Sequence, residues 1–378
     1  MDAWVDEVAG SIAARAEREL RSLVGVSSPS GDVAGAEESM AVAEALAPEE
    51  ARSERVACSS PEHAPDLILR LTGTGQGRLL LVGHVDTVIP HRAHRPLAVE
   101  GDRLTGSGTV DMKGGLVLAL GALRALAART SEFAEAALLL VCDEEWRTAP
   151  FTHVARFDGF DACLCFEAGQ VTESGEDAVV VKRKAAGTLR VRAHGRQAHS
   201  GSAPDRGINA LLALAEAAQL VAARHAPDGD QRLTAVPTVI RSGDAFNVVP
   251  GEGELVSDLR ADDHRAFDAV CAGIPAELRG ARMESELVRV WPGMDSREAT
   301  AGLLARTGEA LGRAVVPAGR GGASDASHFA ASISITVDGL GPRGGGAHAP
   351  HEYILRDSLR SRAEVAAAMV HAWLTTSS

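Results

Sequence analysis

The stretch "LLLVGHVDTVIP", residues 79–90, places a histidine and an aspartate one residue apart at the end of an apolar run. The run has the length and composition of a buried strand. In an open α/β sheet, ligands bind beyond the carboxyl ends of the strands. His84 and Asp86 are therefore predicted to lie at the edge of the sheet where a ligand would bind.

The chain on both sides of this run alternates short apolar segments with helical patterns, which is typical of α/β domains. The first residues are amphipathic at helical spacing, through Trp4, Val8, Ile12 and Ala16. Strands are predicted at 67–73, 78–86, 136–145, 161–167 and 332–341, and further helices at 113–130 and 358–373. The predicted fold is α/β, with a mixed, mostly parallel sheet flanked by helices.

A segment with a different order of predicted strands and helices interrupts this pattern. Its predicted elements are a strand at 188–195, a helix at 207–226, strands at 232–243 and 252–261, a helix at 264–278 and a strand at 282–291. This β-α-β-β-α-β order is that of the ferredoxin-like unit. We therefore expect one domain from residues 1–185 and 293–378, with a second domain, residues 186–292, inserted into it.

Composition limits the classes of partner. The chain has 378 residues, and its 51 acidic against 38 basic side chains give a formal charge of -13, which disfavours nucleic acid and anionic membranes. No apolar run reaches the length of a membrane span. The five cysteines are odd in number, lie mostly in apolar runs and have no paired CxxC spacing. A cytoplasmic location is expected, with reduced, buried thiols.

Five separate segments carry acidic or imidazole side chains at predicted strand ends or in glycine-rich loops. Any one of them alone could be a turn or cap residue, and paired glutamates could begin a solvated helix. Together they favour a metal site, because clustered carboxylates repel one another unless cations are present. The residues are His84 with Asp86, Asp111 in "GSGTVDMKGG", the pair Glu144 and Glu145, Glu167, and His348 in "GGGAHAPHEY".

This ligand set mixes imidazole and carboxylate without thiolate, which suits zinc, or else cobalt or manganese. With one bridging carboxylate it could hold two divalent ions and activate a water between them. Asp86 would then accept a hydrogen bond from the far ring nitrogen of His84 and fix its tautomer.

Seven motifs in order resemble the di-zinc exopeptidase and deacylase family that includes carboxypeptidase G, acetylornithine deacetylase, succinyl-diaminopimelate desuccinylase and aminoacylase-1. They are "GHVDTV", "GSGTVDMKGGL", "DEE", "FEAG", "GRQAHSGSAPDRGINA", "GGASDASHF" and "GGGAHAPHEY". The carboxypeptidase G branch is the most similar in its motifs. The resemblance implies a zinc exopeptidase fold with an inserted lid and dimerisation domain, and hence a homodimer.

The resemblance also assigns roles to residues. Asp111 would bridge two zinc ions, and Glu144 would be the general base. The peptide bond after Asp111 would be cis. The remaining ligands would be His84 and Glu167 on one ion, and Glu145 and His348 on the other.

In the inserted domain, His199 matches the histidine that reaches the partner subunit's active site and stabilises the oxyanion, although it could be an ordinary loop residue. Asn247 and Arg260 match residues that bind the substrate carboxylate, for which the guanidinium fork is suited. Arg260 could instead pair with Asp258.

The chain departs from the family pattern at "DEEWRTAP" and "VWP", where Trp146, Arg147 and Trp291 could reshape the substrate pocket. The predicted function is zinc-dependent hydrolysis of the amide bond of a C-terminal amino acid in a small peptide or N-acyl amino acid. An acetyl or succinyl amino acid deacylase is the nearest alternative. A non-catalytic homologue that binds an amino-acid derivative is an alternative of another class.

Overall fold

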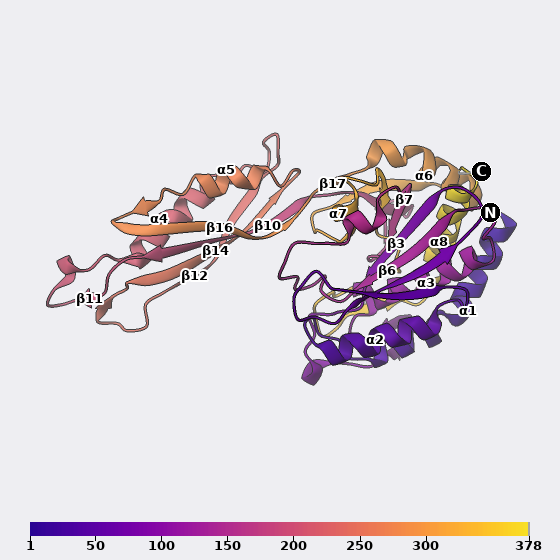
Figure 1. The fold of residues 1–378 in the computed structure, drawn as a ribbon, viewed down its shortest axis with the longest axis horizontal. Coiled ribbons are helices and arrows are strands. Elements are labelled where there is room, and N and C mark those ends of the chain that lie inside the picture. Colours follow the sequence, from indigo (N-terminus) through magenta and orange to yellow (C-terminus); the bar gives the residue numbers. More distant parts are fainter. Residues whose placement is uncertain (377–378) are drawn as a thin grey trace. The chain divides into compact units, whose positions relative to one another are not determined.

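Six strands form the central sheet of the computed structural model, which describes residues 1–376 (Figure 1). The neighbouring strands β6, β3, β7 and β19 are parallel, whereas β2 pairs antiparallel with β6, and β1 with β2. This arrangement confirms the predicted mixed, mostly parallel sheet. In spatial order the strands are β1 (Arg52–Val56), β2 (Asp66–Thr72), β6 (Glu135–Val141), β3 (Arg78–His84), β7 (Ala162–Cys165) and β19 (Ile335–Val337).

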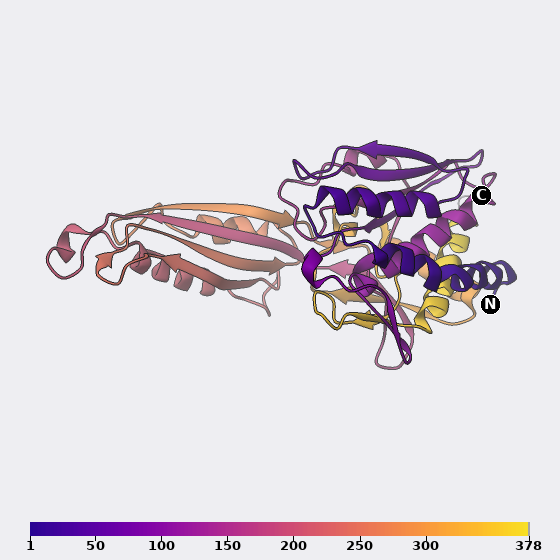
Figure 2. The ribbon, with the colours of Figure 1, turned by 90° about the horizontal axis from the view of Figure 1, so that it is seen from below.

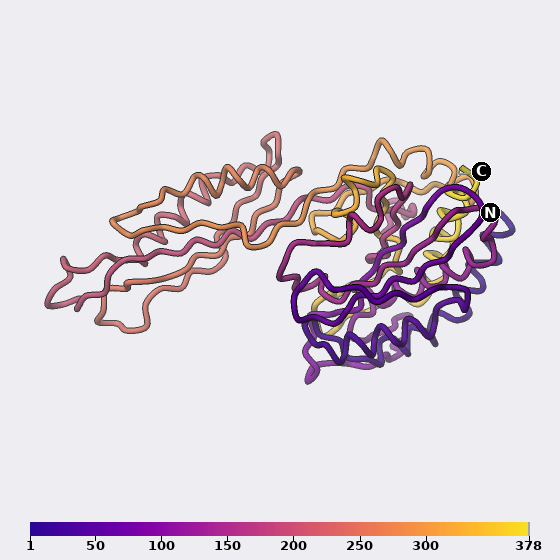
Figure 3. The backbone as a smooth tube through the Cα atoms, viewed as in Figure 1, coloured from indigo at the N-terminus to yellow at the C-terminus, as the bar shows by residue number. Residues whose placement is uncertain are grey.

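Long helices pack on this sheet and on one another. Helix α1 lies beside both α3 and α8, so helices from the first and last parts of the described chain are neighbours (Figure 3). Most residues of α3 and α8 are buried, and α3 is apolar on almost every face, as expected for a helix inside a core. The helices of this layer are α1 (Ala3–Gly25), α2 (Val33–Leu46), α3 (Gly114–Ala127), α6 (Arg297–Leu311), α7 (Ala326–Phe329) and α8 (Ser358–Leu374).

Two smaller sheets complete this part of the chain. One has the order β17-β9-β18 with β8 paired to β9, and the other has the order β20-β21-β5-β4. Their strands are β4 (Ala98–Glu100), β5 (Arg103–Thr105), β8 (Gln170–Val171), β9 (Asp177–Arg183), β17 (Met294–Asp295), β18 (Val315–Arg320), β20 (Gly344–Gly345) and β21 (Tyr353–Leu355). Within residues 1–376, no helix is long and apolar enough to cross a lipid bilayer.

The inserted segment forms its own antiparallel sheet, with the order β12-β14-β10-β16-β15. Helices α4 and α5 pack on one face of it (Figures 1 and 2), and the strand residues alternate between buried and more exposed positions. The main strands have the spatial order of a ferredoxin-like unit. The elements are β10 (Ala185–His194), α4 (Ala210–Ala222), β12 (Thr234–Ser242), β14 (Glu252–Ala261), α5 (Ala266–Ala272), β15 (Glu277–Leu278) and β16 (Ala281–Trp291).

Contacts divide the chain into two units. Unit 1 comprises Met1–Lys182, Asp295–Gly319 and the residues from Ser324 onward. Unit 2 comprises Arg183–Met294 and Arg320–Ala323, so it begins and ends a few residues outside the predicted 186–292 and includes a short extra segment.

Several elements are shorter than predicted from the sequence. Strands β3 and β6 end at His84 and Val141, and the polar residues that follow them lie in loops. Helix α4 begins only after Asn209, whose side chain accepts a hydrogen bond from the Leu212 amide at 3.2 Å. Helix α5 stops at Ala272, because Gly273 and then Pro275 interrupt the helical pattern.

Candidate metal centre

His84 is the last residue of β3 and is almost completely buried. Its Nδ1 lies 3.0 Å from the backbone oxygen of Asp86 and 3.2 Å from the Asp86 carboxylate. These contacts direct Nε2 toward Asp111 Oδ1, at 3.1 Å, and Glu167 Oε1, at 3.7 Å. One imidazole nitrogen and two carboxylates therefore converge beyond the sheet.

Asp111 lies in an irregular turn, Thr109–Lys113, that precedes α3. Its peptide bond to Met112 is cis, and Gly108 before the turn has a φ of 75°, which glycine adopts without steric cost. The buried carboxylate of Glu352 accepts hydrogen bonds from the amides of Gly108, Val110 and Asp111, at 2.8, 2.7 and 3.0 Å. Glu352 thus holds the backbone of the turn.

Glu352 was missed in the sequence analysis. It follows His348 within the motif "GGGAHAPHEY". Its place in that motif was the one feature of the sequence that could have pointed to a role at the site. Its partners lie more than 240 positions earlier in the chain, and no local pattern identifies them.

A second set of donor atoms shares Asp111. His348 Nε2 lies 3.1 Å from Asp111 Oδ2 and 3.1 Å from Glu145 Oε2. The Glu145 amide donates to Asp86 Oδ2 at 3.1 Å, which ties the loop after β6 to the loop after β3. His348 itself adopts a left-handed conformation with a φ of 65°.

The structure thus brings together all five residues predicted to bind metal. They form two groups, His84 with Asp111 and Glu167, and Asp111 with Glu145 and His348, and the ligand atoms within each group lie within 4.8 Å of one another. Imidazole and carboxylate ligands fit zinc and related divalent ions, and a carboxylate common to both groups can bridge two of them.

The carboxylates of this centre favour the protonated form of both imidazoles when no ion is bound. Burial favours neutral His84, but its hydrogen bonds with Asp111 and Asp86 raise its pKa well above the ordinary value. Hydrogen bonds to Asp111 and Glu145 raise the pKa of His348 to about 10. A divalent ion must displace these protons, because a histidine ligand binds metal in its neutral form.

Glu144 lies beside this centre. Burial raises the pKa of its carboxyl well above the ordinary value; the charges of Asp325 and Glu167 also raise it, and that of His84 lowers it. A carboxyl group with a raised pKa near metal ligands is suited to accept and return a proton.

Arg147, which the sequence analysis placed among residues that could reshape the substrate pocket, is held in buried ion pairs. Its guanidinium is buried, with Nη2 2.8 Å from Asp143 Oδ1 and Nη1 2.6 Å from Asp325 Oδ1. It therefore links the end of β6 to the segment before α7. Phe151 stacks on it, with its ring centre 4.6 Å from the guanidinium carbon.

The two tryptophans differ in exposure. Trp146 is 51% exposed, whereas Trp291 is 4% exposed in unit 2 and is covered by the Arg289 guanidinium. Of this pair, Trp146 alone offers its ring to solvent.

The three predicted residues of unit 2 lie on β11, in the turn before β13 and on β14. His199 and Asn247 are exposed and close in space, because β11 (Ala198–His199) pairs with β13 (Val248–Val249) and the Ser200 amide donates to the Asn247 backbone oxygen. His199 Nδ1 accepts from the amides of Gly201 and Ser202 at 3.1 and 3.2 Å, which leaves the proton on Nε2. Arg260 on β14 pairs with Asp258 at 2.9 Å, the alternative named above.

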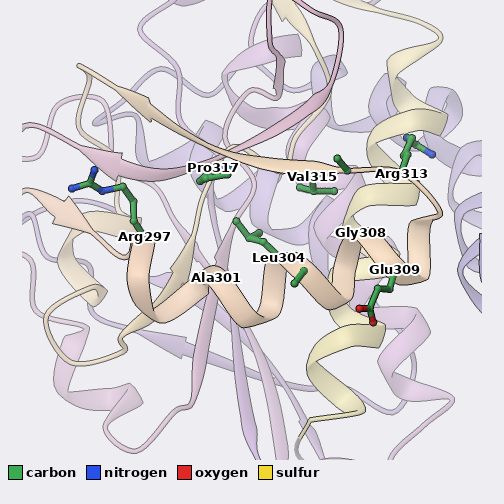
Figure 4. Close-up of a pocket in the computed structure, with 10 residues that line it drawn as sticks. Arg297, Ala301, Leu304, Gly308, Glu309, Arg313, Val315 and Pro317 are labelled. Atoms are coloured by element: carbon green, nitrogen blue, oxygen red, sulfur yellow. The ribbon is translucent and has the colours of Figure 1, made fainter.

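A separate cavity of about 560 Å³ lies between α6 and β18 (Figure 4). Leu304, Val315 and Pro317 line its middle, and Arg297 and Arg313 lie at its ends. None of the metal-ligand candidates lines it, so this cavity is distinct from the candidate metal centre.

A family model described as "Peptidase family M20/M25/M40" matches residues 80–372. Carboxypeptidase G2 of Pseudomonas sp. (strain RS-16) is 26% identical over 321 residues, which are 81% of this chain and 76% of that protein. A succinyl-diaminopimelate desuccinylase of Methylorubrum extorquens is 30% identical over 227 residues, 55% of this chain and 58% of the relative. The chain thus spans little more than half of the desuccinylase.

Solved structures have the same fold. A tripeptidase from Staphylococcus aureus superposes with a TM-score of 0.74 at 19% identity, over 96% of this chain and 99% of that one. An M20 family metallo-carboxypeptidase from Sulfolobus solfataricus gives 0.72 at 16% identity, over 95% and 99% of the chains.

Proposed function

Because the chain belongs to peptidase family M20/M25/M40, we propose that it is a zinc-dependent hydrolase that cleaves the amide bond of a C-terminal amino acid in a small peptide or N-acyl amino acid. This membership confirms the resemblance found in the sequence. The carboxypeptidase and desuccinylase relatives also support a metal-dependent hydrolase that acts on such amides.

One observation carries the proposal. Two groups of ligand atoms share Asp111, and Glu144, which is not in either group, lies next to the ligand Glu145. His84, Glu167, Glu145 and His348 are the proposed remaining ligands of two zinc ions. When bound, such ions act as Lewis acids that lower the pKa of water and polarise a carbonyl group.

The proposed catalytic steps use residues of the chain as follows. Glu144 takes a proton from the attacking water and delivers it to the leaving amine, which needs no covalent intermediate. Asp86 keeps the His84 tautomer with its free nitrogen toward Asp111 and Glu167. His199 donates a hydrogen bond from Nε2 to the oxyanion, since its Nδ1 is occupied as an acceptor.

Arg260 and Asn247 are proposed to bind the free carboxylate of the substrate. This role requires Arg260 to exchange its pairing with Asp258 for the substrate, since both side chains are only partly buried. For Arg260→Ala we expect KM to rise about tenfold with little change in kcat, because one charge-assisted contact is lost in ground and transition states alike. Unchanged KM and kcat would exclude this role.

A homodimer through unit 2 is proposed as the assembled form. The edge strand β12 exposes Val236, Val239 and Ile240, and α4 exposes Leu211 and Leu212. An apolar edge strand of this kind favours pairing with another strand. We also propose a cytoplasmic location, which the five unpaired cysteines support.

The experiment that tests the hydrolase is amine release from a panel of dipeptides and N-acyl amino acids, with zinc or cobalt added. Glu144→Ala provides the blank, because it keeps all five proposed ligands. Release that is lost in this variant supports the proposal and identifies the acyl group.

Release from acetyl or succinyl amino acids alone would favour the deacylase alternative, which the desuccinylase relative supports. If the metal-loaded protein releases no amine from any member of the panel, hydrolysis of these amides is contradicted and the non-catalytic binding alternative is favoured.

A further inference from the structure

A third group of potential metal ligands lies in unit 1 and shares no residue with the two groups that contain Asp111. It consists of Cys58 in the loop after β1, Asp66 at the start of β2 and Cys142 directly after β6. One donor atom from each residue lies within 4.8 Å of the other two. The candidate metal centre contains no sulfur ligand, so the two sites differ in the chemistry of their ligands.

The spacing of the thiols matches the requirement of a tetrahedral ion. The sulfur atoms of Cys58 and Cys142 are 3.9 Å apart. Two thiolates bound to zinc at about 2.3 Å with tetrahedral geometry lie about 3.8 Å apart. A disulfide requires about 2.05 Å, so the pair is not bonded but already has the separation of two zinc ligands.

Asp66 supplies an oriented carboxylate. It is completely buried and accepts hydrogen bonds from the Cys142 amide at 3.0 Å and from His153 Nε2 at 2.8 Å. Each carboxylate oxygen can accept at more than one position, so these contacts fix the group and still leave capacity for an ion. Carboxylates that ligate metals are usually held by hydrogen bonds from neighbouring groups in this way.

Two carboxylates lie near the thiols and are held in place by other side chains. Asp66 accepts a hydrogen bond from His153 Nε2, and Asp143 is paired with the Arg147 guanidinium. Cys58 is only partly buried, whereas Cys142 is 1% exposed, so solvent and ions reach the group from the side of Cys58.

We propose that Cys58, Cys142 and Asp66 form a binding site for a thiophilic divalent cation of the zinc type, separate from the catalytic centre. On binding, the two thiols each release a proton to solvent and form a metal–sulfur bond, and Asp66 contributes an oxygen. Water occupies the fourth position on the side of Cys58. The ion connects the loop between β1 and β2 to the end of β6, immediately before Glu144 and Glu145.

Cobalt(II) titration of the reduced, metal-free full-length protein tests this site. Thiolate bound to cobalt gives an intense near-ultraviolet charge-transfer band, and imidazole and carboxylate ligands do not. We expect such a band in the wild-type protein, which disappears in Cys58→Ser and in Cys142→Ser. It persists in Cys163→Ser and Cys271→Ser, the matched cysteine controls, and in His348→Ala, which affects only the catalytic centre.

Because Cys58 is partly exposed, Cys58→Ser provides a folded variant even if the buried Cys142→Ser does not fold. Absence of the band in cobalt-saturated protein whose thiols are shown to be reduced would overturn the proposal. A band that survives both serine substitutions would also overturn it. Neither result depends on amide hydrolysis, so the site can fail while the proposed enzyme activity stands.

Discussion

The two units place their charged side chains in different environments. In unit 1, His84, Asp86, Asp143 and Arg147 are almost completely buried, and each contacts an oppositely charged or hydrogen-bonding partner. In unit 2, the pairs of Arg260 with Asp258 and of Arg265 with Asp263 remain partly or largely exposed. Buried charges are costly to leave unpaired, whereas exposed pairs contribute little to stability.

This difference indicates where substitutions have consequences. The buried charges of unit 1 hold one another in place, so the loss of one disturbs the candidate metal centre or the fold. The exposed charges of unit 2 are free to exchange partners with solvent or a ligand. Four predictions test this contrast.

The largest effect is expected for Glu144→Gln. Removal of the proposed general base should lower kcat by about 10²- to 10⁴-fold, because proton transfer then lacks a positioned acceptor. Metal content, measured by elemental analysis, should stay at the wild-type value, since Glu144 is not a proposed ligand. The control is Glu286→Gln in unit 2, whose side chain is 50% exposed. Equal kcat in both variants would remove Glu144 from the mechanism.

Arg147→Met tests the buried ion pairs through stability. It leaves the carboxylates of Asp143 and Asp325 without their guanidinium, which should cost about 3–5 kcal/mol of unfolding free energy. Urea unfolding measures this loss, and Arg265→Met, at an 81% exposed side chain, should show no measurable change. The double variant Arg147→Met with Asp325→Asn should regain part of the lost unfolding free energy, because one of the two unpaired carboxylates is then neutral. Similar stabilities of the two methionine variants would contradict the contrast between the units.

Asp86→Asn tests the positioning of a ligand. Because the Asp86 carboxylate contacts the far nitrogen of His84, its neutralisation should weaken metal binding by about 10- to 100-fold. Competition with a chelator measures the affinity. Asp258→Asn, the equivalent change in unit 2, should leave the metal affinity unaltered. A comparable loss of affinity in Asp258→Asn would point to a general effect of charge.

The smallest effect is a pH dependence of the metal-free protein. His348 has a pKa of about 10 in the fold against 6.5 for the free side chain, so its stabilising contribution is complete below pH 6.5 and is lost as the pH rises through 10. Unfolding of metal-free protein across this range should show the decline. His348→Gln should flatten this decline, and the zinc-loaded protein should show less of it, since the ion replaces the proton. A decline of the same size in His348→Gln would assign it to other groups.

Much of the fold and the ligand set could be predicted because each depends on short patterns. Apolar runs ending in His84 or before Glu144 mark strand ends, and parallel strands bring these ends to one edge of a sheet. Asp111 and His348 could be assigned as ligands because the motifs around them carry the resemblance to a metal-dependent family.

Other features depend on contacts between distant parts of the chain. Nothing near Arg147 indicates that Asp325, 178 positions later, would pair with it. The thiols of Cys58 and Cys142 likewise meet only because β1, β2 and β6 are neighbours in the sheet. Helix α2 was not predicted, because its many alanines give only a weak amphipathic pattern.

The three amide hydrogen bonds accepted by Glu352 have a consequence for the order of events during synthesis. A ribosome releases the turn at Thr109–Lys113 long before it releases Glu352 and His348. Contacts of such high sequence separation form late, because a long loop must close first. The nascent chain therefore cannot complete the candidate metal ligand set at Asp111 before His348 has left the ribosome.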